Sequence, residues 1–105
     1  MVNEILTAAG IKYRQGRLTG QKAPTEAVYL DDITTDGPDG LPRIRRHDIT
    51  VELYEDRPDD AAEKALEDAI SAAGLQWTKQ DRYWLQTEHM YQVIYEFFYF
   101  EKVRT

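Results

Sequence analysis

The chain has 105 residues, of which 42% are hydrophobic and 30% are charged, values typical of one folded domain with a modest core rather than of a disordered segment. It contains no cysteine, which excludes disulfide frameworks, thiolate zinc sites and cysteine nucleophiles. The formal net charge of −6 argues against a protein whose main task is to bind nucleic acid.

The first segments in chain order predict a short helix and a short strand. Residues 2–9 favour a helix that ends before Gly10, because glycine is favoured just after a helix C-terminus. Residues 11–14 favour a short strand, and the glycine- and proline-containing residues 15–25 favour a loop. The N-terminus lacks the features of a signal peptide, and no apolar run approaches the ~20 residues of a membrane span. We therefore expect no membrane partner.

Two strands and a long loop between them form the next predicted unit. Residues 26–34 are rich in β-branched and aromatic side chains, and residues 43–55 alternate apolar and polar side chains from Ile49 onward. Residues 35–42 between them are rich in aspartate, glycine and proline, which turns select. The pattern predicts a β-hairpin with a loop longer than the tight two-residue turns.

The acidic stretch DDITTDGPDGLP, residues 31–42, also has to be weighed as a calcium loop or a catalytic carboxylate cluster. Its flanks are predicted strands rather than the helices of an EF-hand, and a loop starting at Asp36 would place Pro38, which has no side-chain ligand, at its third position. An exposed loop tip also lacks the burial that separates the pKa values of paired carboxylates. We therefore expect a hairpin loop that binds no metal.

A second helix and the final strands complete the chain. The segment RPDDAAEKALEDAISAAG predicts a helix with an aspartate cap, acids in its first turn and an apolar stripe that ends at Gly74. Residues 75–79 predict a short strand, and residues 81–89 a turn that leads into a long strand over residues 90–103. The chain is thus expected to be a single α+β domain, residues 1–105, of order α-β-β-α-β-β. Its antiparallel sheet has a long hairpin and a helix packed on one face.

The final strand concentrates the aromatic residues, because nine of the twelve lie between Trp77 and Phe100. One face of this strand is expected to lie in the core and consists of Tyr91, Val93, Tyr95, Phe97 and Tyr99. The other face carries Ile94, Phe98 and Phe100. This second face either forms a surface for a partner or lies beneath the N-terminal helix.

No motif in the sequence indicates catalysis. There is no glycine-rich phosphate loop, no nucleophile elbow and no H-E-x-x-H metal motif. His47 and His89 have no ligand-like spacing around them, so each is more simply a surface or sheet-edge residue. The run RIRR, residues 43–46, offers phosphate contacts but more simply balances the acids around it. We therefore expect no enzyme activity, no cofactor and no metal.

Several segments together resemble a family of phage proteins. The segments AVYLDDITTDGPDG and RRHDITVELYED, the helix that ends at Gly74, LQWTK and the closing EHMYQVIYEFFYFEK are similar in their order to the tail terminator, or tail completion, proteins of long-tailed phages and prophages. The resemblance covers about residues 11–102 and rests on the order of elements rather than on one motif. It implies a ring, usually of six subunits, that caps the head-proximal end of the tail tube, stops tube growth and joins the tail to the head.

The resemblance also implies partners and a location. The partners are other copies of the chain, the tail tube protein and a head-completion or connector protein, in the tail or neck of a virion made in the bacterial host cytoplasm. DNA would pass through the ring without specific binding. A head–tail stopper or another neck protein remains an alternative of the same class. A small intracellular protein-binding or regulatory module that uses its aromatic sheet face is the alternative from another class, and a small enzyme is disfavoured by the missing motifs.

Blocks of opposite charge indicate how copies of the chain would meet. Basic residues gather in residues 12–22 and 43–46, and acidic residues in 26–39 and 48–68. A ring needs a heterologous interface, in which one patch meets a different patch of the next subunit, and segregated charges suit that geometry. We therefore expect a charge-assisted head-to-tail interface that includes Asp36, Asp39, Arg43, Arg45, Arg46, Ile94, Phe98 and Phe100.

Overall fold

Two helices and six strands make up the described part of the chain, which is residues 1–16, 24–36 and 43–103 of the computed structural model. In chain order they are α1 (Val2–Ala8), β1 (Lys12–Gln15), β2 (Thr25–Asp36), β3 (Arg43–Glu55), α2 (Asp60–Ala72), β4 (Trp77–Lys79), β5 (Tyr83–Leu85) and β6 (Met90–Val103). The strands form one sheet of order β1-β2-β3-β6-β4, with β5 also paired to β6. The predicted α+β fold with a long hairpin is confirmed.

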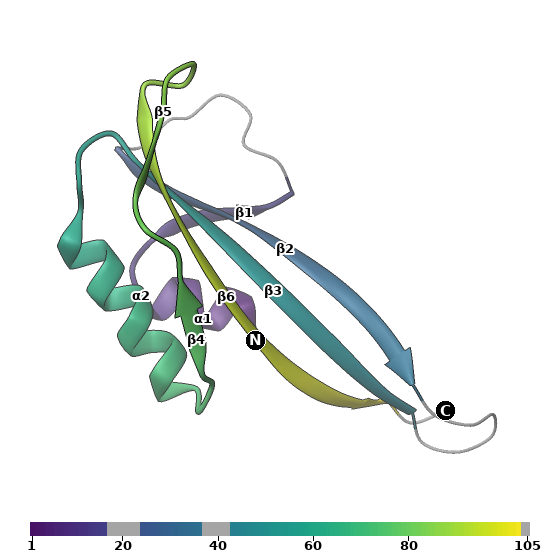
Figure 1. Cartoon of the computed structure of the whole chain (residues 1–105). Coiled ribbons are helices and arrows are strands. Elements are labelled where there is room, and N and C mark those ends of the chain that lie inside the picture. The colour runs from purple at the N-terminus through teal and green to yellow at the C-terminus, as the bar shows by residue number, and fades with distance from the viewer. Residues whose placement is uncertain (17–23, 37–42, 104–105) are drawn as a thin grey trace.

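Three long strands form the centre of the sheet (Figure 1). β3 lies between β2 and β6 and pairs antiparallel with both along its whole length. Short strands line the two edges near one end only: β1 runs parallel to residues 26–29 of β2, while β4 and β5 run antiparallel to β6. The sheet is therefore antiparallel except at its β1 edge.

β5 lies within residues 81–89, where the sequence indicated only a turn, so this part of the prediction was wrong. Trp84 of β5 pairs with Tyr91 of β6, and the centroids of their rings are 4.9 Å apart. Cross-strand aromatic pairs of this kind stabilise a sheet. The turn itself is shorter than predicted and ends at His89, an exposed residue with a positive φ of 52°.

α2 begins and ends where the sequence predicts. The side chain of Asp59 caps it by accepting a hydrogen bond of 3.0 Å from the backbone N–H of Ala62, and Asp60 and Glu63 place negative charge in its first turn. Gly74 follows its C-terminus with φ of 80°, a conformation that glycine adopts without steric cost. These local signals need no tertiary partner, which is why the sequence alone shows them.

Both helices cover the same face of the sheet, which we call the helix face. Val2, Ile5 and Leu6 of α1 and Leu66 and Ile70 of α2 share one core cluster with alternate strand residues, namely Ala27, Tyr29, Ile49, Val51, Leu53, Val93, Tyr95 and Phe97. The predicted inward face of the final strand is thus confirmed for Val93, Tyr95 and Phe97, with Tyr99 packed against them, whereas Tyr91 lies outside the core cluster. The N-terminal helix packs against α2 and does not cover the second face of the sheet.

The opposite face of the sheet, which we call the open face, is buried only near β5. There Val28, Tyr54 and Met90 form a small second cluster, against which Leu85 packs. Toward the other end of β6, Phe98 is 44% exposed and Phe100 is 61% exposed. The sequence left two alternatives for this face, and in the described residues no helix covers it.

The sheet narrows at its far end to a three-stranded ribbon. β1 pairs only with residues 26–29 and β4 only with residues 95–97, so residues 30–36, 43–50 and 98–103 continue without an edge strand among the described residues. Figure 1 shows β2, β3 and β6 extending together past both helices. We call these three segments the ribbon. The molecule is accordingly elongated, with extents of 50 × 27 × 22 Å.

Candidate interaction surface

The ribbon holds most of the contact residues predicted from the sequence. Asp36 and Arg43 are the terminal residues of β2 and β3 at its tip, and Asp39 lies outside the described residues. Ile94 lies further along β6, half-buried on the open face opposite Glu52. The structure therefore spreads these residues along the ribbon and its base rather than gathering all of them in one patch.

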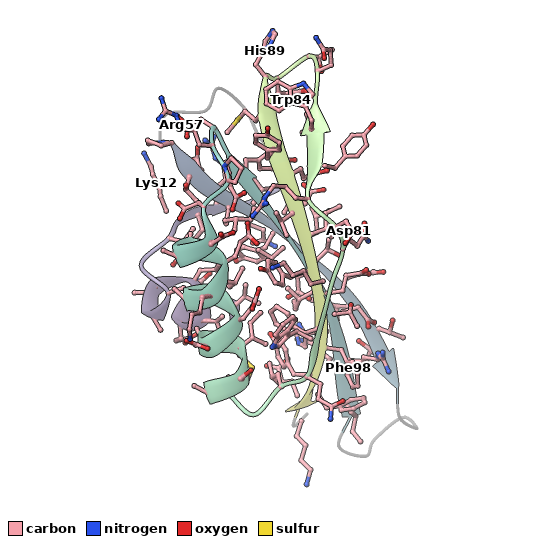
Figure 2. The ribbon with its side chains drawn as sticks, turned by 60° about the vertical axis from the view of Figure 1, so that its left-hand side comes forward. Lys12, Arg57, Asp81, Trp84, His89 and Phe98 are labelled. Atoms are coloured by element: carbon pink, nitrogen blue, oxygen red, sulfur yellow. The ribbon has the colours of Figure 1, made fainter. Side chains whose placement is uncertain are left out.

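Three of the predicted residues do form one exposed cluster on the open face. The guanidinium carbon of Arg46 lies 4.1 Å from the ring centroid of Phe98 and 5.8 Å from that of Phe100. The two rings are 5.7 Å apart in an edge-to-face arrangement. We call Arg46, Phe98 and Phe100 the arginine–aromatic cluster; Figure 2 shows Phe98 near the end of the molecule that is opposite Trp84 and His89.

The arginine–aromatic cluster is held in place from within the chain. The Nε–H of Arg46 donates to both carboxylate oxygens of Asp48, at 3.0 and 3.1 Å. Because the guanidinium is fixed by this pair and by stacking on the rings, little side-chain entropy is left to lose on binding. Arginine and aromatic side chains are also the residues that contribute most to binding at protein interfaces.

Arg45 lies on the other side of the sheet from Arg46. Neighbouring residues of a strand point to opposite faces, so Arg45 joins the helix face, where its guanidinium lies 4.0 Å from Glu101. Arg45 and Arg46 of the run RIRR therefore point to opposite faces of the sheet, each beside an acid, as expected of a run that balances the acids around it. Arg45 and Arg46 each lie close to an acid of the same chain, which reduces the charge that either can offer to a partner.

A hollow of about 280 Å³ lies beside the arginine–aromatic cluster. Its lining residues come from β3, β6 and the segment that contains β4, and they are Asp48, Ile49, Thr50, Gln76, Trp77, Thr78, Glu96, Phe97 and Phe98. The lining contains two carboxylates but no histidine or other residue with a basic side chain. The hollow extends the exposed surface of the open face.

His47 lies on the helix face of the ribbon, beyond the helices, and is only 7% exposed. Its Nδ1 is 2.9 Å from Asp31 of β2, its Nε2 is 2.9 Å from Glu101 of β6, and its ring stacks on Tyr99 at 4.5 Å. This set joins the three strands of the ribbon through one imidazole. The prediction of a surface or sheet-edge residue was wrong for His47, because β3 is the central strand; His89 is exposed, as predicted.

The protonation of His47 follows from its neighbours. Burial alone disfavours the charged ring, but hydrogen bonds to Glu101 and Asp31 outweigh burial and raise the pKa of His47 above its ordinary value. The same hydrogen bond lowers the pKa of Glu101. The ribbon therefore favours an imidazolium that donates both of its N–H groups to carboxylates.

A second charged cluster lies under α2, at the other end of β3. Glu55 is fully buried, and burial together with the neighbouring carboxylate of Glu63 raises its pKa to about 8. Arg82 lies 3.4 Å from Glu55 and 2.7 Å from Glu63, while Lys79 lies 2.8 Å from Glu63. Neither carboxyl oxygen of Glu55 has a hydrogen-bond partner within the described residues.

The cluster around Glu55 has the paired carboxylates that acid–base enzymes use, but the setting is that of a structural network. Lys79 also contacts Glu67, which accepts a hydrogen bond of 2.7 Å from the hydroxyl of Tyr95 in the core. These contacts fasten α2 to the segment that contains β4 and β5. None of the acids or bases of this cluster lines the hollow on the open face.

The described residues contain few other candidates for a site. The described residues contain no group of three or more histidine, cysteine or acidic side chains that could hold a metal ion. Within the same residues no helix combines the length and the apolar character needed to span a bilayer. The predicted metal-free loop, residues 35–42, lies largely outside the described residues. The open face of the ribbon thus remains the strongest candidate for a functional surface.

The chain is similar in structure to a protein of known context. No protein-family model matches the chain, and no curated protein sequence matches it. Among solved structures, the chain is similar to a chain from the "Virion of native gene transfer agent (GTA) particle", with a TM-score of 0.57 and 16% sequence identity. The match covers 90% of this chain and 81% of that chain. At this identity the likeness shows that the two chains share a fold.

Proposed function

We propose that the protein is a structural component of a phage-like particle and that it acts there as a tail terminator. In this role, copies of the chain form a ring on the head-proximal end of the tail tube, stop tube growth and join the tail to the head. The observation that carries the proposal is the shared fold with a chain of a gene transfer agent virion, over 90% of the present chain. The resemblance of the sequence to the terminator family supports the finer role.

The proposed partners follow from that role. They are further copies of the chain, six to a ring in the family that it resembles, together with the tail tube protein and a head-completion or connector protein. The net charge of −6 suits a channel through which DNA slides without specific binding. The work of such a protein is assembly in the tail or neck after synthesis in the host cytoplasm, and it requires neither catalysis nor a cofactor.

The proposed contact residues remain Asp36, Asp39, Arg43, Arg45, Arg46, Ile94, Phe98 and Phe100. Among them the arginine–aromatic cluster has the strongest support, because Phe98 and Phe100 are large, exposed and held beside a fixed arginine. Exposed apolar side chains that gather on one face of a small protein usually mark an interaction surface.

The proposal is tested with purified tail tubes of the phage or prophage that encodes the chain. The chain is mixed with growing tubes, and tube length and mass are followed by electron microscopy and light scattering. We expect the chain to bind at one end of each tube and to stop elongation. Tubes that elongate normally at saturating chain would contradict the terminator role. Binding to the head connector without binding to tubes would assign the chain to the stopper class.

A small protein-binding module is the second candidate, and the exposed arginine–aromatic cluster is the observation that favours it. A monovalent module needs only one such surface and no second surface for self-association. Sedimentation of the chain with and without tubes separates the two functions. The module is favoured if the chain stays monomeric and binds neither tubes nor connector. It is favoured further if the chain binds another protein and loses that binding on Phe98→Ala substitution.

A further inference from the structure

We propose that the two free edges of the ribbon pair with each other between copies of the chain, so that β6 of one copy lies parallel to β2 of the next. This inference rests on the proposed function, because the ring supplies the neighbouring copy. It concerns a feature that the sequence did not reveal, namely the unpaired backbone at both sides of the ribbon.

The hydrogen bonds at the paired end of the sheet show which backbone groups point outward. The carbonyl of Tyr29 in β2 accepts from Gly16 at 3.0 Å, so it faces the β1 edge. Along a strand, the backbone N–H and C=O of successive residues point to alternate sides. Beyond β1, the backbone N–H and C=O groups that point away from β3 therefore belong to Asp31, Ile33 and Thr35. These groups have no partner strand among the described residues.

The same reasoning identifies the outward groups of β6. The carbonyl of Ile94 accepts from Gln80 at 2.9 Å and so faces the β4 edge. Beyond β4, the outward groups are those of Phe98, Phe100 and Lys102. Within the described residues each copy thus presents two edges without a partner strand, one on β2 and one on β6. Their donors and acceptors alternate as a further strand would match.

Several features by which proteins usually prevent edge pairing are absent from these two edges, namely proline, a bulge and a very short edge strand. Both edges do carry charged side chains, among them Asp32 and Lys102. Residues 30–36 and 98–103 contain no proline, and their pairing with β3 runs without a bulge. Both edges also carry exposed apolar side chains, because Leu30 is 46% exposed and Ile33 is 49% exposed on β2, opposite the exposed Phe98 and Phe100 on β6.

Charge decides which edge meets which. Pairing β2 with β2 of another copy would bring its aspartates, among them Asp31 and Asp32, next to their own counterparts, and like charges directly opposite each other destabilise a pair. The β6 edge instead offers Lys102. Neither Asp32 nor Lys102 forms an ion pair within the described residues, and both lie on the open face. Pairing of β2 with β6 therefore joins an acidic edge to the edge that carries an unpaired lysine.

Strand direction makes this contact head-to-tail. β2 and β6 are both antiparallel to β3, so they run in the same direction within one copy. A rotation about an axis roughly along the ribbon would keep that direction, so β2 of the next copy would run parallel to β6. Each copy would then use one edge on each side, which is the heterologous contact that closes a ring and leaves no edge exposed.

The first test uses proline on the β2 edge. Ile33→Pro removes an outward N–H without removing a bond to β3, and Ile33→Ala is the matched control that shortens the side chain and keeps the N–H. We expect both variants to stay folded by circular dichroism. Ile33→Pro should weaken association by roughly tenfold at each subunit boundary, as the loss of one hydrogen bond with its acceptor left unpaired predicts, and should fail to cap tubes.

The second test uses the absence of cysteine from the chain. Chains carrying Thr34→Cys on the β2 edge are mixed with chains carrying Lys102→Cys or Phe100→Cys on the β6 edge, all on the open face, and are oxidised with and without tubes. Mixed disulfides between the β2 and β6 edges are expected to exceed β2–β2 disulfides at least several-fold. If Ile33→Pro fails to fold, the disulfide pattern still tests whether β2 of one copy pairs with β6 of the next.

The outcomes separate this inference from the proposed function. A folded Ile33→Pro chain that caps tubes like the wild type, or cysteine pairs that join only β2 to β2, would overturn edge pairing while the terminator role stands. Mixed β2–β6 disulfides in a chain that never binds tubes would leave edge pairing intact and remove the terminator role.

Discussion

His47 is a buried imidazole held between two carboxylates, and this placement links the stability of the ribbon to pH. A group whose folded-state pKa is raised stabilises the fold at pH values below its ordinary pKa. That stabilisation is lost as the pH rises through the folded-state value. The reverse holds for Glu101, whose pKa is lowered, so its contribution is lost as the pH falls. The imidazolium of His47 and the carboxylate of Glu101 are therefore both charged at pH values between the lowered pKa of Glu101 and the raised pKa of His47.

The first prediction follows from this linkage. Replacement of His47 by glutamine keeps a polar side chain but removes the charge, and it should lower the free energy of unfolding by roughly 1–3 kcal/mol at pH 6. The loss should shrink as the pH rises above the ordinary histidine value, because the wild type then loses its imidazolium. Denaturant unfolding at pH 6 and at pH 9 measures both quantities. A difference between the two proteins that is the same at both pH values would show that the pKa of His47 is not raised in the fold.

Substitution of Glu55 is predicted to stabilise the fold, whereas substitution of His47 is predicted to destabilise it. Its pKa, raised to about 8, means that the folded chain holds a proton that the unfolded chain releases near the ordinary glutamate value. The wild type therefore loses stability as the pH rises from about 4.5 toward 8. Glutamine at this position has no proton to hold, so Glu55→Gln should gain stability relative to the wild type over that range, on the order of 1–3 kcal/mol at pH 8.

The check on Glu55 is the pH profile rather than a single value. Unfolding free energies of wild type and Glu55→Gln are compared from pH 5 to pH 8, with Glu67→Gln, at a partly exposed position of α2, as the control. If the gain of Glu55→Gln is no larger at pH 8 than at pH 5, then Glu55 is ionised in the folded chain and its contact with Arg82 is a simple ion pair.

At the scale of elements, the alternation along β6 separates two neighbouring phenylalanines. Phe97 is 4% exposed in the core, whereas Phe98 is 44% exposed on the open face. Phe97→Ala should cost about 3–5 kcal/mol of unfolding free energy, as large-to-small core changes do. Phe98→Ala should cost less than about 1 kcal/mol yet weaken tube capping. Chemical denaturation of both variants measures this. Similar losses of unfolding free energy at the two positions would mean that Phe98 on the open face is packed within the chain rather than exposed to solvent.

The elements that the sequence predicts are those whose signals are local. α2 has its cap, its acidic first turn and Gly74 within one segment, and the alternation of β3 and β6 is visible along each strand. β5 was missed, because three residues carry little periodicity and their role depends on which strand they reach. Residues 11–14 were predicted as a short strand, close to β1. The parallel β1–β2 pair in particular depends on long-range contacts and not on residues 11–14 themselves.

The contact residues were predictable only in part for the same reason. Phe98 and Phe100 stood out because their face of β6 had no obvious cover. The set around His47 did not, since Asp31 lies 16 residues before it and Glu101 lies 54 residues after it. Only the register of β2 and β6 against β3 brings the three together. If that register had been known, the odd numbers of residues 31, 47 and 101 would have shown that the three side chains point to the same face of the sheet.

At the scale of the whole molecule, fewer charged side chains are available for contacts between copies than the blocks of charge in the sequence indicate. Much of the apparent segregation is neutralised inside the chain: Arg14 pairs with Glu26 at 2.7 Å, and Arg46 pairs with Asp48 at 3.0 Å. Glu26 is buried in the first pair, whereas an exposed pair such as Arg46–Asp48 contributes only ~0–1 kcal/mol to stability. The charge that is left for a partner is therefore local, along the edges and the open face of the ribbon.

The last prediction concerns the two arginines that the sequence treats as one patch. Arg46→Glu would put a carboxylate beside Asp48 and remove the cation from the rings of Phe98 and Phe100. Because Arg46 is exposed, the variant should stay folded, and because its patch is proposed to meet another subunit, it should fail to form rings or to cap tubes. High salt should weaken the wild-type assembly in the same direction.

Arg45→Glu is the matched control, since the same charge change then falls on the helix face beside Glu101. It should stay folded and lose less capping than Arg46→Glu, because Arg45, although also a proposed contact residue, lies outside the arginine–aromatic cluster. Tube length and unfolding free energy are measured for both variants and for the double variant, with tubes present in case the ring needs the tube end as a template. Equal loss of capping in both single variants would mean that both faces of the ribbon are in contact within the ring. A folded Arg46→Glu chain that caps tubes normally would exclude the arginine–aromatic cluster from the contact and leave the ribbon edges as the surfaces that join one copy to the next.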